Sequence, residues 1–244
     1  MSLVYTGDLG TYRYGVWKMD AEQQGIDAEL SEFPIPELKA AHRKLEFISV
    51  RKLAQVMGVD PSNIDYTVSG KPLLRDLPET HISISHSRHY AAFMISKQAY
   101  TGIDIEEYSD RIIRIRSRFM NIEEENTLRQ LFSKQPYSEK VELIALYLHW
   151  CAKEAMYKAL DIPGLDFKQD LGIDFCETDG AVHLLSGNNC IEGDNAIMGN
   201  NSLPGNSLQN KQGRFKAFYF PQQIRFNIDY CIHEDYLLTC CSSE

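Results

Sequence analysis

The chain has 244 residues, of which 43% are hydrophobic and 24% charged, the balance of a soluble globular protein with one large domain or two smaller ones. Its formal net charge of −9 argues against a nucleic-acid-binding protein, because such proteins usually carry a basic surface for phosphates. The sequence shows neither an apolar run of the roughly 20 residues that span a membrane nor a signal-peptide pattern. Its cysteines form no C-x-x-C pair, which favours free thiols in a reducing cytoplasm.

The first half of the chain predicts a helix followed by strands. Apolar residues recur at three- and four-residue steps over residues 36–57, which predicts a helix that ends at Gly58. Residues 82–86 alternate apolar and polar side chains, as a half-buried strand does. Residues 90–96 and 99–105 flank a short polar link, and this pattern predicts a β-hairpin.

The second half predicts helices and then strands. Residues 111–131 form a helical region, and residues 139–160 form a longer helix. Strand patterns follow at residues 172–175, 182–185, 215–220, 224–228 and 236–240. We therefore expect an α+β protein of two subdomains, an N-terminal one over residues 1–98 and a C-terminal one over residues 99–244.

A six-residue repeat rich in Asn and Gly occupies residues 186–209. Such repeats can build a parallel β-helix, but that fold needs more stacked copies than this segment holds. We therefore expect a surface insertion between two strands of the C-terminal subdomain.

Two carboxylates stand at alternate positions of the segment T-G-I-D-I-E, residues 101–106. On a strand, Asp104 and Glu106 share one face while Ile103 and Ile105 occupy the other. Two like charges this close repel each other unless a cation lies between them, and Mg²⁺ prefers oxygen ligands of this kind. A solvated strand face is the alternative interpretation.

The segment W-x-x-K-E-A-x-x-K, residues 150–158, lies on the predicted long helix. Its Trp150, Lys153, Glu154, Tyr157 and Lys158 fall within one broad arc. Glu154 could add a third carboxylate to a metal, and the two lysines could neutralise phosphate oxygens. The alternative is a surface pair between Glu154 and Lys158, worth about 0.3–0.5 kcal/mol.

The order and spacing of these two segments resemble the signature of the 4′-phosphopantetheinyl transferases. The chain length and the upstream segments Gly70-Lys71-Pro72 and Ile84-Ser85-His86-Ser87 are similar to the larger, surfactin-synthetase-activating type. The likeness covers about residues 41–160, whereas residues 1–35 show no clear match. It implies a monomeric pseudo-dimer of two similar α+β subdomains, with coenzyme A in the cleft between them.

The resemblance also implies roles for individual residues. It assigns the metal ligands, expected to hold Mg²⁺, to Asp104, Glu106 and Glu154. It assigns proton transfer to Glu124 and positive charge at the reacting phosphate to Lys158. Under the resemblance, the cofactor-binding positions are Arg43, Lys71, Ser85, His86, Asp104, Lys153, Glu154 and Lys158. By themselves, several of these would be ordinary surface or structural residues.

The implied reaction moves the 4′-phosphopantetheine arm of coenzyme A to a serine of an apo carrier protein, acyl, peptidyl or similar, and releases 3′,5′-adenosine bisphosphate. A metal-dependent phosphohydrolase and a carrier-protein-binding module without turnover remain alternatives. Carrier proteins of this kind are typically acidic, so a local basic surface is expected on this acidic chain. Arg111, Arg114 and Arg118 form the densest basic stripe and are the candidate docking surface.

Overall fold

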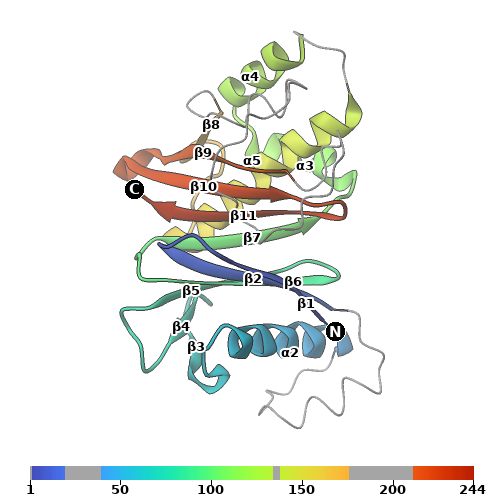
Figure 1. Cartoon of the computed structure of the whole chain (residues 1–244). Coiled ribbons are helices and arrows are strands. Elements are labelled where there is room, and N and C mark those ends of the chain that lie inside the picture. The colour runs from blue at the N-terminus through green and yellow to red at the C-terminus, as the bar shows by residue number, and fades with distance from the viewer. Residues whose placement is uncertain (1, 20–39, 134–137, 176–210) are drawn as a thin grey trace.

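The structure, a computed structural model, describes residues 2–19, 40–133, 138–175 and 211–244. Two antiparallel sheets lie face to face, and helices cover the outer side of each (Figure 1). The described part of the chain therefore has four layers: helix, sheet, sheet and helices. This mixture of helices and antiparallel sheets confirms the predicted α+β class.

The first sheet is built by the N-terminal half of the chain. In their order across the sheet, its strands are β1 (Ser2–Asp8), β2 (Tyr12–Lys18), β6 (Tyr90–Ser96), β5 (His81–His86), β4 (Pro72–Leu74) and β3 (Ile64–Tyr66). Helix α2 (Ala41–Val56) packs on the outer face, where Ile48 and Leu53 are fully buried. The helix predicted over residues 36–57 is confirmed from Ala41 onward, and residues 36–39 lie outside the described part.

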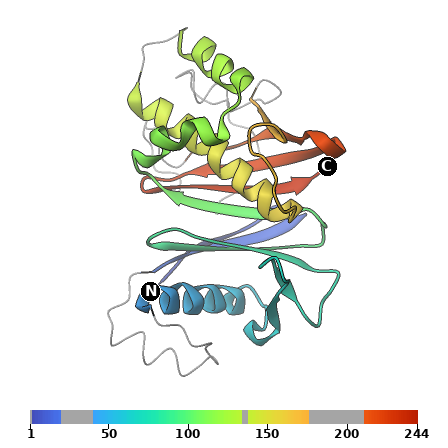
Figure 2. The ribbon, with the colours of Figure 1, turned by 180° about the vertical axis from the view of Figure 1, so that it is seen from behind.

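The second sheet is built by the C-terminal half. Its strands are, in order, β7 (Thr101–Glu107), β11 (Tyr236–Ser243), β10 (Ile224–Ile232), β9 (Lys211–Tyr219) and β8 (Leu171–Asp174). The long helix α5 (Glu139–Leu160) crosses its outer face, as Figure 2 shows, and has the predicted bounds. The predicted helical region 111–131 is two helices, α3 (Arg111–Phe119) and α4 (Ile122–Ser133), because the backbone becomes extended at Met120.

The predicted hairpin over residues 90–105 is wrong. Strand β6 pairs with β2 and β5, whereas β7 pairs with β11. Residues 97–100 carry the chain from one sheet to the other instead of turning it within a sheet. The alternation of apolar and polar residues predicted both strands correctly, but it contains no information about their partners.

The inner faces of the two sheets share one buried core, formed by Tyr12, Tyr14, Val16, Tyr90, Ala92, Met94, Ile103, Ile105, Cys231, Tyr236, Leu238 and Cys240. The boundary of the two sheets falls between Ser96 and Thr101. Division into subdomains at residues 98 and 99, and the similarity of the two halves about a cleft, remain predictions.

A ladder of serine hydroxyls joins the two sheets along the free edge of β7. Alternate residues of β5 and the turn after it accept hydrogen bonds from backbone N–H groups of β7. The acceptor and donor residues are Ser83 and Ile103 (3.0 Å), Ser85 and Ile105 (3.3 Å), and Ser87 and Glu107 (3.0 Å). In an extended chain every second residue points to the same side. The serines and the N–H groups of β7 therefore repeat at the same spacing, and each hydroxyl meets one N–H group.

The remaining predicted strands of the second half are confirmed where the structure describes them. Strands β8, β9, β10 and β11 cover the predicted segments near residues 172, 215, 224 and 236. The strand predicted at 182–185 and the repeat at 186–209 lie outside the described residues. The described cysteines Cys151, Cys231, Cys240 and Cys241 are free and buried. Among the described helices, none is long and apolar enough to cross a membrane.

Candidate active site

Strand β7 directs its two acidic side chains toward helix α5. Ile103 and Ile105 belong to the core between the sheets, which leaves the alternate residues Gly102, Asp104 and Glu106 on the opposite face. A Cβ atom added at Gly102 would lie 1.9 Å from the backbone oxygen of Ala155. Only glycine therefore allows α5 to pack this closely, and the close approach brings the helix against the carboxylates.

Three residues of α5, one helical turn apart, face this strand. They are Trp150, Glu154 and Lys158, at spacings of four residues. The indole Nε1 of Trp150 donates to Oε1 of Glu106 at 3.0 Å, and Nζ of Lys158 donates to Oδ1 of Asp104 at 2.7 Å. The broad arc predicted from the sequence thus contains a narrower stripe that reaches the carboxylates.

Asp104 is held by partners from both halves of the chain. Its Oδ1 accepts hydrogen bonds from Oγ of Ser85 at 2.8 Å and from Lys158. Lys158 also donates to Oγ of Ser85 at 2.7 Å, so the three groups form a closed triangle. The other oxygen of Asp104, Oδ2, is buried and has no hydrogen-bond partner among the described residues. A buried carboxylate oxygen in this state has an unused site for a cation.

The pKa values of the two neighbouring glutamates, Glu106 and Glu154, are raised in this environment. Burial, and then the charge of Asp104, raise the pKa of Glu106 to about 7. The same two causes, in the same order, raise the pKa of Glu154 to about 7, against the opposing effect of Lys158. The charge of Asp104 thus acts on both glutamates, and Lys158 offsets this repulsion only in part.

A divalent cation fits the chemistry of this oxygen-rich set, because it would relieve the repulsion and occupy the free Oδ2. Within the described residues, however, no group of three or more His, Cys, Asp and Glu side chains has a metal-binding arrangement. Asp104 is instead bonded to Lys158, and Glu106 to Trp150. The magnesium site at Asp104, Glu106 and Glu154 remains a prediction.

Lys153 points away from this face and into the protein. Its side chain is 0% exposed, and Nζ donates to the backbone oxygens of Phe119 at 2.7 Å and Phe167 at 2.9 Å. The ammonium group also lies 2.8 Å from the carboxylate of Glu124. All of these partners are internal, so the structure does not bring Lys153 to the surface that holds Asp104. Its assignment to coenzyme A phosphates remains a prediction.

Glu124 is enclosed in the same way. Besides Lys153, its carboxylate accepts hydrogen bonds from the backbone N–H groups of Asn121 at 2.9 Å and Ile173 at 3.1 Å. Burial nevertheless raises its pKa, against the opposing effect of Lys153. The carboxylate ties the start of α4 to strand β8, and its predicted part in proton transfer remains a prediction.

The cofactor-binding residues expected upstream take two positions. Nζ of Lys71 donates to the backbone oxygen of Ala159 at 2.7 Å, near the C-terminal end of α5, and burial lowers its pKa. Arg43 on α2 and His86 at the end of β5 meet at Glu46, at 2.9 and 3.2 Å. Glu46 was not predicted from the sequence, because an acidic residue on a helix is ordinarily part of a solvated face.

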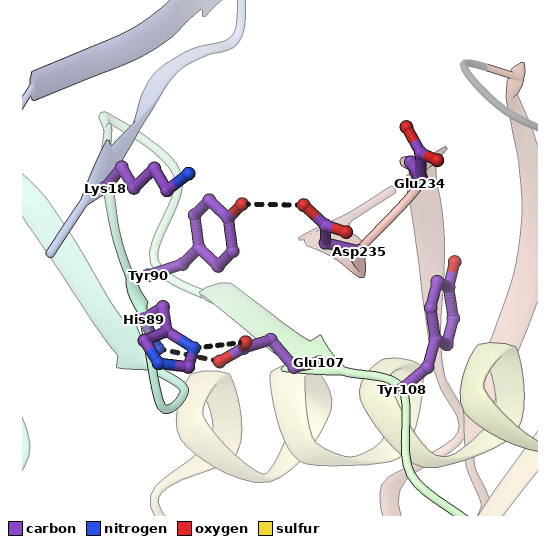
Figure 3. A pocket seen from close by; sticks show the side chains of 7 residues that line it. All are labelled: Lys18, His89, Tyr90, Glu107, Tyr108, Glu234 and Asp235. Carbon is purple, nitrogen blue, oxygen red and sulfur yellow. Dashed lines mark hydrogen bonds and ion pairs between the residues drawn. The ribbon is translucent and has the colours of Figure 1, made fainter. Parts of the chain in front are cut away.

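A cavity of about 550 Å³ lies beside the carboxylate strand, at its other face (Figure 3). Glu107 neighbours Glu106 in the chain but turns toward this cavity, where its carboxylate accepts from the backbone N–H of His89 at 2.7 Å and lies 2.8 Å from Nδ1 of that residue. The lining residues are Lys18, His89, Tyr90, Glu107, Tyr108, Glu234 and Asp235. None of the predicted site residues lines it.

Comparison with known proteins supports the predicted relationship. Residues 100–194 match the sequence model of a family described as the 4′-phosphopantetheinyl transferase superfamily. The resemblance to this superfamily is confirmed. The matched segment includes β7 and α5, and with them Asp104, Glu106 and Glu154. Arg43, Lys71, Ser85 and His86 precede it.

Curated relatives carry the same name. The chain is 31% identical over 122 residues to a 4′-phosphopantetheinyl transferase of Bacillus subtilis, covering 48% of this chain and 51% of that protein. It is 30% identical over 128 residues to 4′-phosphopantetheinyl transferase Sfp of Bacillus subtilis strain 168, with the same coverage of 48% and 51%. It is 34% identical over 90 residues to 4′-phosphopantetheinyl transferase psf-1 of Bacillus pumilus, covering 37% of this chain and 36% of that protein. The chain thus spans about half the length of the first two relatives that it matches, and less of the third.

Proposed function

We propose that this protein transfers the 4′-phosphopantetheine arm of coenzyme A to a serine of an apo carrier protein, in a magnesium-dependent reaction. The observation that carries the proposal is the carboxylate set of Asp104, Glu106 and Glu154, which lies inside the segment matched by the superfamily. Its excess of negative charge and the free Oδ2 of Asp104 suit a divalent cation, and a cation there suits a pyrophosphate ligand.

The reaction requires one bond to form and one to break at the β-phosphorus of coenzyme A. The serine oxygen bonds to this phosphorus, the bond to the bridging pyrophosphate oxygen breaks, and 3′,5′-adenosine bisphosphate leaves. Asp104, Glu106 and Glu154 are the residues that would hold the metal. When bound, Mg²⁺ supplies positive charge at the pyrophosphate oxygens.

Lys158 is the side chain of this site best placed to contact the substrate phosphates. It is 26% exposed, and its ammonium group lies beside Asp104 without being enclosed. It can therefore donate to a phosphate oxygen on which charge develops as the leaving group departs. The serine proton must pass to a base; the resemblance assigns this to Glu124, which in the structure is bonded to Lys153 and two backbone N–H groups.

The test is incubation of the protein with an apo carrier protein, coenzyme A and Mg²⁺, followed by mass spectrometry of the carrier. The expected result is a carrier heavier by one phosphopantetheine group and an equal amount of 3′,5′-adenosine bisphosphate. Release of phosphate without modification of the carrier would instead indicate a phosphohydrolase. Stable binding of the carrier without either product would indicate a module that has no turnover.

We further propose that the protein acts as a cytoplasmic monomer, on coenzyme A and a carrier protein of the acyl or peptidyl kind, without nucleic acid or membrane. The net charge of −9 supports a partner other than nucleic acid, and the free, buried cysteines of the described residues support a reducing compartment. Analytical ultracentrifugation tests the monomer directly, and a dimer at micromolar concentration would contradict it.

A further inference from the structure

Glu46 on helix α2 is the common partner of three basic side chains. Its Oε1 lies 3.1 Å from Nε2 of His42 and 3.2 Å from Nδ1 of His86, and its Oε2 accepts a hydrogen bond from Nη1 of Arg43 at 2.9 Å. His42 and Arg43 belong to the same helix as Glu46, whereas His86 ends strand β5. We call this arrangement, Glu46 with His42, Arg43 and His86, the Glu46 clasp.

The clasp is buried on its acidic side and open on its basic side. The side chain of Glu46 is 10% exposed, whereas those of His42, Arg43 and His86 are 51%, 63% and 37% exposed. Arg43 has five N–H donors, of which one bonds to Glu46, and His86 uses Nδ1 and leaves Nε2. Within the described part of the chain, the other nitrogens of Arg43 and His86 have no protein partner, so a ligand could approach them from solvent while Glu46 contacts them from its buried side.

The clasp also connects with the carboxylate site. Burial lowers the pKa of His86; Glu46 opposes this effect, while Lys158, Arg43 and His42 add to it. Lys158 in turn bonds to Asp104. Lys158 also donates to Oγ of Ser85, the residue before His86, so one phosphorylated ligand could contact both His86 and Lys158.

We propose that Glu46 is a positioning residue for coenzyme A, which holds Arg43 and His86 in the orientation that binds the phosphates of the cofactor. The proposal rests on the proposed function. A carboxylate at Nδ1 fixes the orientation of the imidazole, and it offsets the charge of the imidazolium that forms when an anion binds and accepts from Nε2–H. The guanidinium group, fixed at one nitrogen, loses less freedom when it binds a phosphate.

The opposite effect of Glu46 is also physically possible, which makes the test decisive. A carboxylate close to a phosphate site adds negative charge, and it competes with the phosphate for the same donors. If this competition outweighed the positioning effect, removal of the charge would tighten the binding of coenzyme A. The sign of the change in affinity therefore separates positioning from competition.

The experiment compares the full-length protein with Glu46→Gln, Glu46→Asp and the matched control Glu79→Gln, which removes the same charge from an exposed loop residue. Calorimetry gives the dissociation constants of coenzyme A and of 3′,5′-adenosine bisphosphate, and steady-state assays give KM and kcat. We expect Glu46→Gln to raise both dissociation constants and the KM for coenzyme A about five- to tenfold, with kcat within about twofold of wild type. Glu46→Asp should recover part of the affinity, and Glu79→Gln should match wild type.

Unchanged or tighter binding in Glu46→Gln would overturn the clasp and leave the proposed function intact. A fall in kcat equal to the rise in KM would also overturn it, because positioning for binding does not slow the chemical step. A wild-type protein that binds neither coenzyme A nor the bisphosphate would overturn the clasp together with the proposed function. Melting curves establish that each variant is folded; if Glu46→Gln is not, Glu46→Asp decides the same question.

Discussion

Helix α5 contributes the lysines of two lysine–carboxylate pairs, which differ in the exposure of the lysine and in the hydrogen bonding of the carboxylate. Lys153 and Glu124 form what we call the enclosed pair, with side chains 0% and 4% exposed and a full set of internal hydrogen bonds. Lys158 and Asp104 form the open pair, in which the lysine is 26% exposed and Oδ2 of the aspartate has no hydrogen-bond partner among the described residues. Five residues of one helix thus separate a satisfied ion pair from an unsatisfied one.

The difference indicates which pair is available for chemistry. A buried ion pair whose partners are all internal cannot bind a ligand without breaking those bonds, and breaking them is costly. A pair with an unused oxygen and a partly exposed ammonium group can exchange partners as a ligand arrives. We therefore assign the enclosed pair chiefly to stability and the open pair to the proposed reaction.

The largest effect on turnover is expected from a mutation in the open pair. Asp104→Ala should lower magnesium-dependent turnover on the order of a thousandfold, because it removes the carboxylate that both glutamates and Lys158 share. The melting temperature should stay close to that of wild type. Mass spectrometry of the carrier protein measures turnover, and Asp76→Ala, at an exposed loop position, is the control. Normal turnover in folded Asp104→Ala would remove this residue from the site.

Mutation of the enclosed pair should change the stability of the protein. Lys153→Met leaves the buried Glu124 without its cation and should lower the free energy of unfolding by about 3 kcal/mol. Adding Glu124→Gln should restore part of this loss, because no uncompensated charge then remains. Denaturant unfolding of both single variants and the double variant measures the coupling.

The same variants test the predicted role of Glu124 in proton transfer. If the enclosed pair is structural, folded Glu124→Gln should retain turnover within a few-fold of wild type at saturating substrates. A large fall in kcat with little change in stability would instead show that Glu124 acts on the serine proton.

His149 lies one helical turn before Lys153; it is buried and forms no ion pair with the described residues. Burial lowers its pKa to about 3, from an ordinary value of 6.5, while Nδ1 lies 2.8 Å from the backbone oxygen of Ala145. A depressed folded-state pKa stabilises the protein above pH 6.5, and this stability is lost as the pH falls below that value. Protonation of the unfolded chain should therefore lower the unfolding free energy by about 2 kcal/mol between pH 6.5 and pH 5.

The measurement is denaturant unfolding at pH 7.5, 6.5, 5.5 and 5.0, for wild type and His149→Gln. The carboxylates titrate in both proteins, so the difference between the two pH profiles isolates the histidine. We expect the variant to lose less stability than wild type on acidification. Parallel profiles would show that His149 is not buried in its neutral form.

The smallest effect on activity is expected from the surface arginines of α3. This helix, like α5, carries both a bonded basic residue and exposed ones. Arg116 is bonded to Glu125 and Glu142, whereas Arg111, Arg114 and Arg118 are exposed. Reversing two exposed charges, with Arg114→Glu and Arg118→Glu, should raise KM for an acidic carrier protein about fivefold at low salt, with coenzyme A affinity unchanged.

The matched control reverses two exposed arginines of the other half, Arg13→Glu with Arg75→Glu, and changes the net charge equally. If only the α3 variant raises KM, and if it loses the salt dependence that wild type shows, the stripe is the docking surface. If both double variants raise KM equally, long-range charge repulsion explains the change, and the stripe is not the docking surface.

The sequence predicted the local elements that carry the open pair well, for physical reasons. The segment around Asp104 has a strict period of two, and α5 has an uninterrupted helical period, so both were located correctly. The carboxylates and the lysine that face one another are separated by about 50 residues, yet each lies on a face that its own period determines. The role of Gly102 was not predicted, because its close contact with Ala155 appears only in the folded structure.

The sequence could not predict strand pairing, side-chain burial or side-chain partners where these depend on contacts with another element of the fold. The pattern of β6 and β7 could not show that they belong to different sheets, because pairing is decided by the whole chain. The helical arc placed Lys153 beside Lys158, but the packing of Phe119 and Phe167 around α5 buries one lysine and not the other. Glu46 was missed because its significance lies in three basic side chains that only the fold brings together.

The serine ladder along β7 has a consequence for how the protein resists self-association. An edge strand with free N–H groups is a template on which another chain can add a strand, the first step toward fibrils. Here side-chain hydroxyls of Ser83, Ser85 and Ser87 occupy those N–H groups. The amide protons at this edge should consequently exchange slowly with solvent although none of the described strands pairs there. A protein in which one hydroxyl is lost, as in Ser83→Ala, should exchange the proton of Ile103 faster and aggregate sooner on mild heating.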